Sequence, residues 1–248
     1  MEINFFEEFP DKKSLDKIKY IKFNTNLYIA AKSKQEFNKI KSQIKNPLIK
    51  KIIYWPILNK KDGYYLSPFS NPKSLKKILK ECQNIPMLWD AEFPRKRILI
   101  LKNLYYFHLN KYKINKFFKK NGKNVHTAEY NIPNKLGYYF LKKIGLSFNP
   151  KKYKNIVVKM VYNSLHLHNK KEFKKILKRY LDQYNKFAVG LGTIGVGINN
   201  NEPDIHPNIL KRDLNLANEL GVKEAIIFRL GGLNKEYAKI INNFMNNQ

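Results

Sequence analysis

Two carboxylates stand one residue apart at the end of an apolar run in the segment IPMLWDAEFP, residues 85–94. They are Asp90 and Glu92. Residues i and i+2 of a β-strand project to the same side of the sheet, so these two carboxyl groups should lie close together. Two nearby carboxylates resist double ionisation, which raises the pKa of one of them. The pattern therefore predicts an acid still protonated near neutral pH beside a charged partner, as general acid–base chemistry requires.

Two other segments place acids after apolar residues in a weaker form of the same pattern. NFFEEFP, residues 4–10, carries Glu7 and Glu8, and NVHTAEYNIP, residues 124–133, carries His126 and Glu129. Acids are sparse in the rest of the chain and lie among lysines. A structural role competes with catalysis at each of these positions, because a buried glutamate could simply pair with Lys159 or Arg229.

Eight continuous apolar runs alternate with helical stretches along the chain, and these elements must position the acids. Apolar runs without polar alternation are typical of buried parallel strands, and regular alternation of strand and helix predicts a parallel sheet. Eight such units in 248 residues predict an α/β fold, a single (β/α)8 TIM barrel that spans residues 1–248 as one domain. The expected strands are 3–9, 26–31, 51–58, 85–93, 124–130, 155–162, 187–198 and 224–230, and the expected helices include 34–46, 71–84, 95–122, 168–186, 206–221 and 234–247.

A doubly wound open sheet is the structural alternative. It would carry a Gly-x-Gly-x-x-Gly turn after its first strand, and this chain has none there. The glycine-rich segment GLGTIGVG, residues 190–197, is expected inside the seventh strand, where glycines relieve crowding.

The active site of a TIM barrel lies at the C-terminal ends of its strands, so the polar residues there are the candidate site. Flat aromatic faces beside carboxylates suit sugar rings, although aromatic residues also fill cores. Tyr64, Tyr65, Phe69, Phe93 and Tyr130 are further aromatic residues expected at the mouth. The candidate catalytic residues are Glu92, Asp90, Glu8, Glu129 and Tyr162, and the candidate substrate-binding residues are Glu7, Tyr54, Trp55, His126, Lys159, Asn163 and Arg229.

The order of two motifs resembles the chitinase-like glycoside hydrolases of family 18. Asp90 and Glu92 form a DxE pair at the end of the fourth strand, and Met160 to Tyr162 form Met-x-Tyr at the end of the sixth. The resemblance implies that Glu92 is the general acid and that Asp90 orients the N-acetyl group of the substrate. It also implies that Tyr162 helps to hold that group. The chain departs from the family's longer DxxDxDxE motif at Leu88, where another aspartate belongs.

The chain has 48 basic and 19 acidic residues and a formal net charge of +29 at pH 7. Only five of the basic residues are arginine, the residue that reads phosphates and bases best. The lysines are spread over every expected helix. We therefore interpret the charge mainly as solvated helix faces, with non-specific nucleic-acid binding that salt would remove.

The remaining composition limits the class of protein. The single cysteine, Cys82, excludes an internal disulfide and a cysteine-based zinc site. No secretory signal opens the sequence, and no apolar run approaches the roughly 20 residues that span a bilayer. We expect a cytoplasmic protein with a carbohydrate or other small-molecule substrate and no membrane partner; its oligomeric state is not predicted.

Three functions remain open at this point. The first is glycoside hydrolase-like chemistry on a sugar by carboxylates at the barrel rim, with no metal and no cofactor. The second is a metal-dependent sugar or sugar phosphate isomerase or lyase of the same fold, in which glutamates and His126 would bind a divalent ion. The third is a basic nucleic-acid-binding protein.

Overall fold

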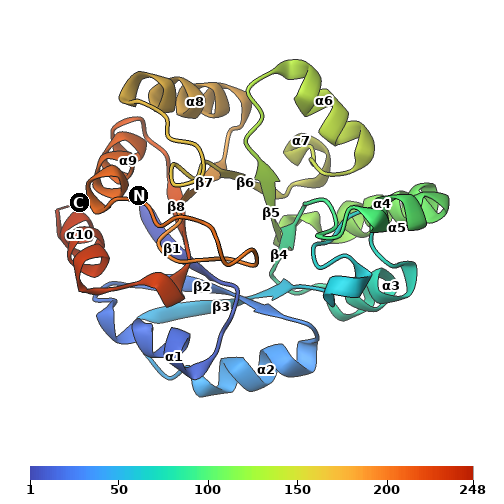
Figure 1. Ribbon diagram of the computed structural model, residues 1–248, viewed down its shortest axis with the longest axis horizontal. Coiled ribbons are helices and arrows are strands. Elements are labelled where there is room, and N and C mark those ends of the chain that lie inside the picture. Colours follow the sequence, from blue (N-terminus) through green and yellow to red (C-terminus); the bar gives the residue numbers. More distant parts are fainter. Residues whose placement is uncertain (248) are drawn as a thin grey trace. The chain divides into compact units, whose positions relative to one another are not determined.

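The computed structural model describes residues 1–247 and contains eight parallel strands that follow one another in sequence order around a closed barrel (Figure 1). The predicted (β/α)8 barrel is therefore confirmed, and each predicted strand is present. The strands are β1 Glu2–Glu7, β2 Thr25–Ala31, β3 Ile49–Pro56, β4 Met87–Asp90, β5 Val125–Tyr130, β6 Ile156–Met160, β7 Phe187–Gly192 and β8 Glu224–Phe228.

Helices follow every strand. The first of these connections holds only the four-residue α1 and a 3-10 helix, η1 (Asp16–Tyr20). The α-helices are α1 Lys12–Leu15, α2 Lys34–Gln43, α3 Pro72–Glu81, α4 Ile98–Lys102, α5 Phe107–Asn121, α6 Lys135–Ile144, α7 Pro150–Tyr153, α8 Lys170–Gln183, α9 Pro207–Glu219 and α10 Lys235–Asn246. The other 3-10 helices are η2 Lys60–Asp62, η3 Leu104–Tyr106, η4 Gly122–Asn124 and η5 Leu230–Gly232.

Asparagine side chains fix where many of the helices begin. The amide oxygens of Asn71, Asn134 and Asn149 accept hydrogen bonds from backbone N–H groups in the first turns of α3, α6 and α7. Asn169 forms a reciprocal capping box with Glu172 at the start of α8. These bonds satisfy donors that the first turn leaves without an intrahelical partner. The many asparagines of this chain therefore help to define its helix boundaries.

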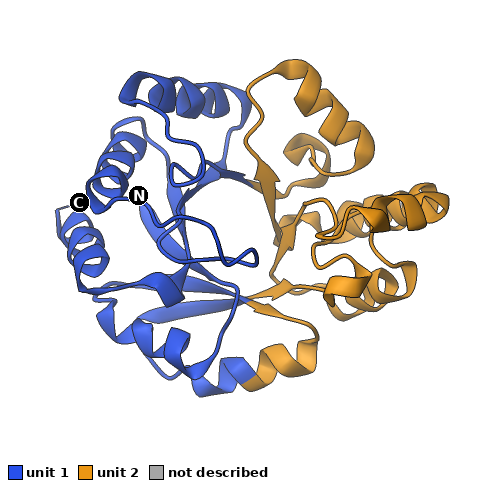
Figure 2. Cartoon of the chain, viewed as in Figure 1, with its two compact units in different colours: residues 1–29, 40–53, 158–248 blue, residues 30–39, 54–157 orange. Residues whose placement is uncertain are grey.

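The chain divides into two compact units (Figure 2). Unit 1 comprises residues 1–29, 40–53 and 158–248, and unit 2 comprises residues 30–39 and 54–157. In unit 1, β8 pairs with both β1 and β7, and all of β7 and β8 is buried. In unit 2, Trp89 of β4 packs among Phe117 and Phe118 of α5 and Phe148. That the whole chain acts as one domain stays a prediction.

The long helix expected at 95–122 is wrong as a single element, because it is interrupted at Asn103. The chain there forms α4, η3 and α5 in succession. The Asn103 side chain turns inward and donates to the Phe69 carbonyl at 2.9 Å, and Asn110 donates to the carbonyls of Pro68 and Ser70 at 3.0 Å. The broken helix is thereby tied to the loop that follows β3.

The seventh strand is also shorter than expected. β7 ends at Gly192, whose φ of +113° is a conformation that other residues rarely adopt. Gly195 and Gly197 therefore lie in the loop between β7 and α9, not inside the strand. That loop reaches Glu8, directly after β1, and Phe228 of β8.

Two further features concern the chain as a whole. Cys82, at the C-terminal end of α3, has no exposed surface, and burial raises the pKa of its thiol to about 12. Among the described residues, no helix is both long and apolar enough to cross a membrane.

Candidate active site

The predicted acid pair lies where β4 ends in unit 2. Asp90 is the last residue of β4 and is 4% exposed, whereas Glu92 lies two residues beyond it and is half-buried. Burial raises the pKa of Glu92 to about 7, against hydrogen bonds from Tyr130 and Asp90 and the positive charge of Arg95, which lower it. A carboxyl group with a raised pKa keeps its proton closer to neutral pH than an ordinary glutamate does. Glu92 can therefore act as either an acid or a base there.

Tyr130 fixes the position of Glu92. Its hydroxyl donates to Glu92 Oε2 at 3.2 Å and accepts from the backbone N–H of Phe93, also at 3.2 Å. The ring of Phe93 lies beside that of Tyr130, with centroids 6.4 Å apart. Tyr130 was expected only as an aromatic residue at the mouth. Its place directly after Glu129 is the sequence signal that it belongs to the opposite face of β5.

The alternation of side chains separates Glu129 from the acid pair. Trp89 faces the helices, so Asp90 faces the interior of the barrel. Asp90 pairs with Ala128 and Trp89 with Thr127, which puts Tyr130 on the face of Asp90 and Glu129 on the face of Trp89. Glu129 was predicted beside Glu92, and the structure does not bring the two residues together.

The buried carboxylate of Glu129 instead holds the segment between α6 and α7. It accepts hydrogen bonds from the Ser147 hydroxyl at 2.8 Å, the Phe148 backbone N–H at 2.9 Å and the Thr127 hydroxyl at 3.1 Å. These donors are themselves buried. The arrangement gives Glu129 a structural role in the layer between strand and helices.

The other predicted site residues of unit 2 are likewise divided between the helix side and the barrel side of their strands. Tyr54 packs on the helix side, where its ring stacks on Phe37 of α2 with centroids 5.0 Å apart. Burial raises its pKa above the ordinary value of 10.0. Trp55, the next residue along β3, projects to the opposite face and is 3% exposed. His126 shares the face of Tyr130, four residues deeper along β5.

In unit 1, Glu7 forms a clamp at the end of β1. Its carboxylate pairs with the Arg229 guanidinium and accepts from the backbone N–H groups of Gly231 at 2.5 Å and Phe9 at 2.7 Å. Burial raises the pKa of Glu7 to about 7, although Arg229 and these hydrogen bonds lower it. A Cβ at Gly231 would lie 2.7 Å from Ser14 Oγ, 2.9 Å from the Arg229 guanidinium and 3.0 Å from Glu7 Oε2, so a larger residue here would require these side chains to shift. Glu7 and Arg229 thus tie β1 to the segment after β8.

Glu8 lies on the opposite side of β1 from Glu7 and is 4% exposed. The loop after β7 covers it, since a Cβ at Gly197 would come within 3.3 Å of both Glu8 Oε2 and the Phe228 ring. Glu202 holds this loop by accepting from the backbone N–H groups of Gly197 and Asn199 at 3.2 and 3.1 Å. Glu8 therefore lies beneath a loop that its own unit supplies.

The predicted residues of β6 and the segment after it also alternate between the two faces. Lys159 is buried on the helix side, with Nζ 5.5 and 5.8 Å from the ring centroids of Tyr180 and Tyr184. Tyr162 lies on the other face, with its ring 5.8 Å from that of Phe228.

Asn163 returns to the helix side, where its amide donates to Asp213 of α9 at 2.6 Å. Its carbonyl oxygen accepts from the His168 backbone N–H at 2.9 Å.

Among residues 1–247, no three His, Cys, Asp or Glu side chains are grouped so that they could hold a metal ion.

Comparison with known proteins finds solved structures that are similar to this chain in fold, but no match based on sequence. No protein-family model matches the chain, and neither does any curated protein. Among solved structures, the PgaB (BpsB) glycoside hydrolase domain from Bordetella bronchiseptica is similar with a TM-score of 0.55 and 10% identity, over 99% of this chain and 97% of that one. A D-tagatose 3-epimerase-like protein gives a TM-score of 0.53 and 10% identity, over 99% and 97% of the two chains.

A class V chitinase from Nicotiana tobaccum is similar with a TM-score of 0.52 and 11% identity, over 96% of this chain and 98% of that one. A mutant of that chitinase was solved in complex with NAG4. The structural neighbours thus include chitinase and glycoside hydrolase TIM barrels, as the sequence resemblance predicts. At this level of identity, the likeness shows the fold.

Proposed function

We propose that this chain is a sugar-acting enzyme of the glycoside hydrolase type and that Glu92 is its general acid. The observation that carries the proposal is the placement of a half-buried Glu92 two residues after the buried Asp90 at the end of β4, with the Tyr130 hydroxyl donating to its carboxylate at 3.2 Å. Burial also raises the pKa of Glu92. A half-buried side chain keeps part of its surface open to a ligand, and Glu92 has that degree of burial.

The chemistry follows from the two carboxyl groups. Protonated Glu92 would give its proton to the oxygen of a glycosidic bond, so that the leaving sugar departs as an alcohol. The resulting carboxylate would then take a proton from the incoming water. By resemblance to the chitinase-like hydrolases, Asp90 would orient an N-acetyl group of the substrate as that group attacks the anomeric carbon.

The comparisons support a carbohydrate as the substrate class. Glycoside hydrolases share this fold, and a chitinase among them was solved with NAG4. Unit 1 has two candidates of its own just beyond the ends of its strands, Glu8 after β1 and Tyr162 after β6.

The test is turnover of aryl glycosides and short N-acetylglucosamine oligomers by the wild type and by Glu92→Gln. Loss of a general acid lowers kcat by about 100-fold or more, while Glu81→Gln, a matched change on α3 in the same unit, should leave kcat unchanged. Full activity of Glu92→Gln would contradict the proposal. Turnover of a free sugar to its isomer, abolished by a chelator and restored by a divalent ion, would instead support the metal-dependent isomerase.

A further inference from the structure

An unusual group of apolar side chains remains exposed on unit 2. Ten of the thirteen large apolar side chains exposed among residues 1–247 belong to residues 98–112 and 136–140, on α4, η3, α5 and α6. We call them the apolar surface. Tyr105 is 89% exposed, Leu136 78% and Leu101 69%. The number of these side chains on four elements of one unit makes this region a candidate binding surface.

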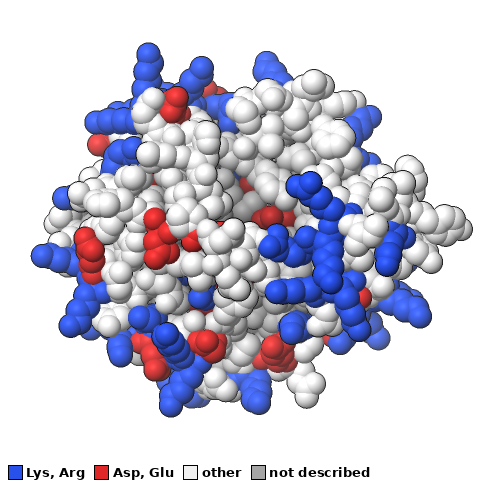
Figure 3. All heavy atoms as spheres, in the orientation of Figure 1, with Lys and Arg blue, Asp and Glu red and all other residues white. Residues whose placement is uncertain are grey.

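The charge around the apolar surface has one sign. From residue 93 to residue 171 the chain contains 19 Lys and Arg residues and a single acid, Glu129. Glu129 is fully buried beneath the α6–α7 segment. All exposed charge on α4 to α7 is therefore positive. Figure 3 shows Lys and Arg side chains gathered over the part of the face where α4 and α5 lie.

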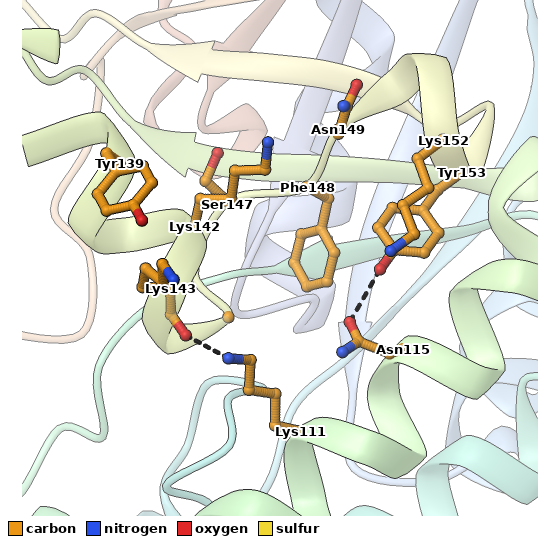
Figure 4. A pocket seen from close by; sticks show the side chains of 11 residues that line it. Lys111, Asn115, Tyr139, Lys142, Lys143, Ser147, Phe148, Asn149, Lys152 and Tyr153 are labelled. Carbon is orange, nitrogen blue, oxygen red and sulfur yellow. Dashed lines mark hydrogen bonds between the residues drawn. The ribbon is translucent and has the colours of Figure 1, made fainter.

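A pocket of about 240 Å³ lies between α5, α6 and α7 (Figure 4). Four lysines line it: Lys111 from α5, Lys142 and Lys143 from α6, and Lys152 from α7. No Asp or Glu is among the described residues that line it. Because Tyr139 belongs both to this lining and to the apolar surface, the pocket and the apolar surface are continuous.

The pocket is preorganised by contacts among its own residues. The Lys111 ammonium donates to the Lys143 carbonyl, and the Tyr153 hydroxyl donates to the Asn115 amide oxygen at 3.0 Å. The ammonium groups of Lys143 and Lys152 lie 5.2 Å from the ring centroids of Tyr139 and Tyr153, respectively. These contacts involve three of the four lysines that line the pocket, where an anionic group would satisfy their charge.

The types of the exposed side chains favour an anionic lipid bilayer over a nucleic acid as the binding partner. Nucleic-acid surfaces stack bases on aromatic rings. Here half of the group is aliphatic, with Leu101, Leu104, Leu109 and Leu136 among its members, and such side chains offer no plane for a base. They gain free energy by leaving water for hydrocarbon. Lysines flanking exposed leucines and tyrosines are the combination that binds the surface of an anionic bilayer.

We infer that unit 2 docks on anionic membrane surfaces, with the apolar surface entering the lipid and the lysine pocket receiving a headgroup phosphate. The attachment is peripheral, as no helix among residues 1–247 could span the bilayer. The sequence predicts no membrane partner because no apolar run could span a bilayer, and a peripheral surface formed by several helices needs no such run.

The inference is tested by sedimentation of the full chain with phosphatidylcholine vesicles, with and without phosphatidylserine, at about 0.15 M salt. The wild type should bind the anionic vesicles and bind the neutral ones much more weakly. Combining Leu101→Ser, Tyr105→Ser and Leu136→Ser should weaken binding about tenfold or more, without changing the net charge. The matched control, Leu165→Ser with Leu167→Ser, alters exposed leucines of unit 1 and should bind as the wild type does.

Charge variants separate a site from the overall basicity of the chain. Lys142→Glu with Lys143→Glu should abolish most binding, whereas Lys171→Glu with Lys175→Glu, the same charge change on α8, should retain it. Equal losses in the two pairs would overturn the inference, as would serine variants of the apolar surface that bind normally. It also fails if those serine variants lose binding to a single-stranded oligonucleotide, or convert a dimer to a monomer, while vesicle binding stays intact. Far-UV circular dichroism checks that every variant is folded.

Discussion

Glu92 shows how one buried group links chemistry to stability. Its pKa is about 7 in the folded protein and near the ordinary 4.5 in the unfolded chain. Between these values the folded state binds more protons, so the contribution of Glu92 to stability is present below pH 4.5 and is lost as pH rises through 7. Above pH 7, the ionised Glu92 should therefore destabilise the fold relative to low pH.

Glu92→Gln should therefore be more stable than the wild type at pH 8 and equally stable at pH 4, because the amide does not ionise. Urea unfolding at the two pH values measures the difference. Glu7 has a similar pKa, but it is present in both proteins and cancels in the comparison. Equal stabilities at pH 8 would show that Glu92 ionises normally.

Sequence alone predicts that Asp90 and Glu92 lie close together because it treats both as strand residues i and i+2, whereas β4 ends at Asp90 and Glu92 lies just beyond it. The sequence does not show which residues of a neighbouring strand lie on the same face of the sheet. A shift of the pairing by one residue would turn every side chain of that strand to the other face. Glu129 and Tyr130 show the limit. Both follow the apolar run of the fifth strand, and only the pairing of Asp90 with Ala128 shows that Tyr130 is the one that reaches Glu92.

At the scale of elements, Glu129 anchors the α6–α7 segment to β5. Glu129→Ala would leave the Phe148 N–H and the Ser147 hydroxyl buried without an acceptor, and each such loss costs about 1–3 kcal/mol. We expect a lower urea midpoint than for Ser147→Ala, which removes one of these bonds and leaves the carboxylate its others. A midpoint for Glu129→Ala equal to that of the wild type would rule out the structural role.

The strands were predictable as elements and the long helix at 95–122 was not. Apolar runs bounded by polar residues define strands locally, and each of the eight expected strands appears. The break at Asn103 depends on a carbonyl of Phe69 that lies 34 residues away. The local helical pattern carries no information about so distant a hydrogen-bond acceptor. Periodicity alone therefore predicts one continuous helix where the structure has α4, η3 and α5.

At the scale of the whole molecule, the barrel was predictable because its signal is the repetition itself. Eight strand–helix units suffice to predict closure, whatever the exact boundaries of each. The lysine count was less informative than the distribution of acids. Lysines occur in every α-helix, but the long interval from residue 93 to residue 171 with only the buried Glu129 distinguishes one region of the exterior.

The lone thiol provides a reporter of how the folded protein opens. Cys82 is fully buried with a pKa of about 12, so a thiol-specific reagent at pH 8 should modify the native protein very slowly. Labelling requires that the end of α3 separate from the strands, and its rate then measures the free energy of that opening. If low urea accelerates labelling without changing the far-UV circular dichroism, α3 opens before the barrel unfolds. One unmodified cysteine thus reports on that order with no engineered probe.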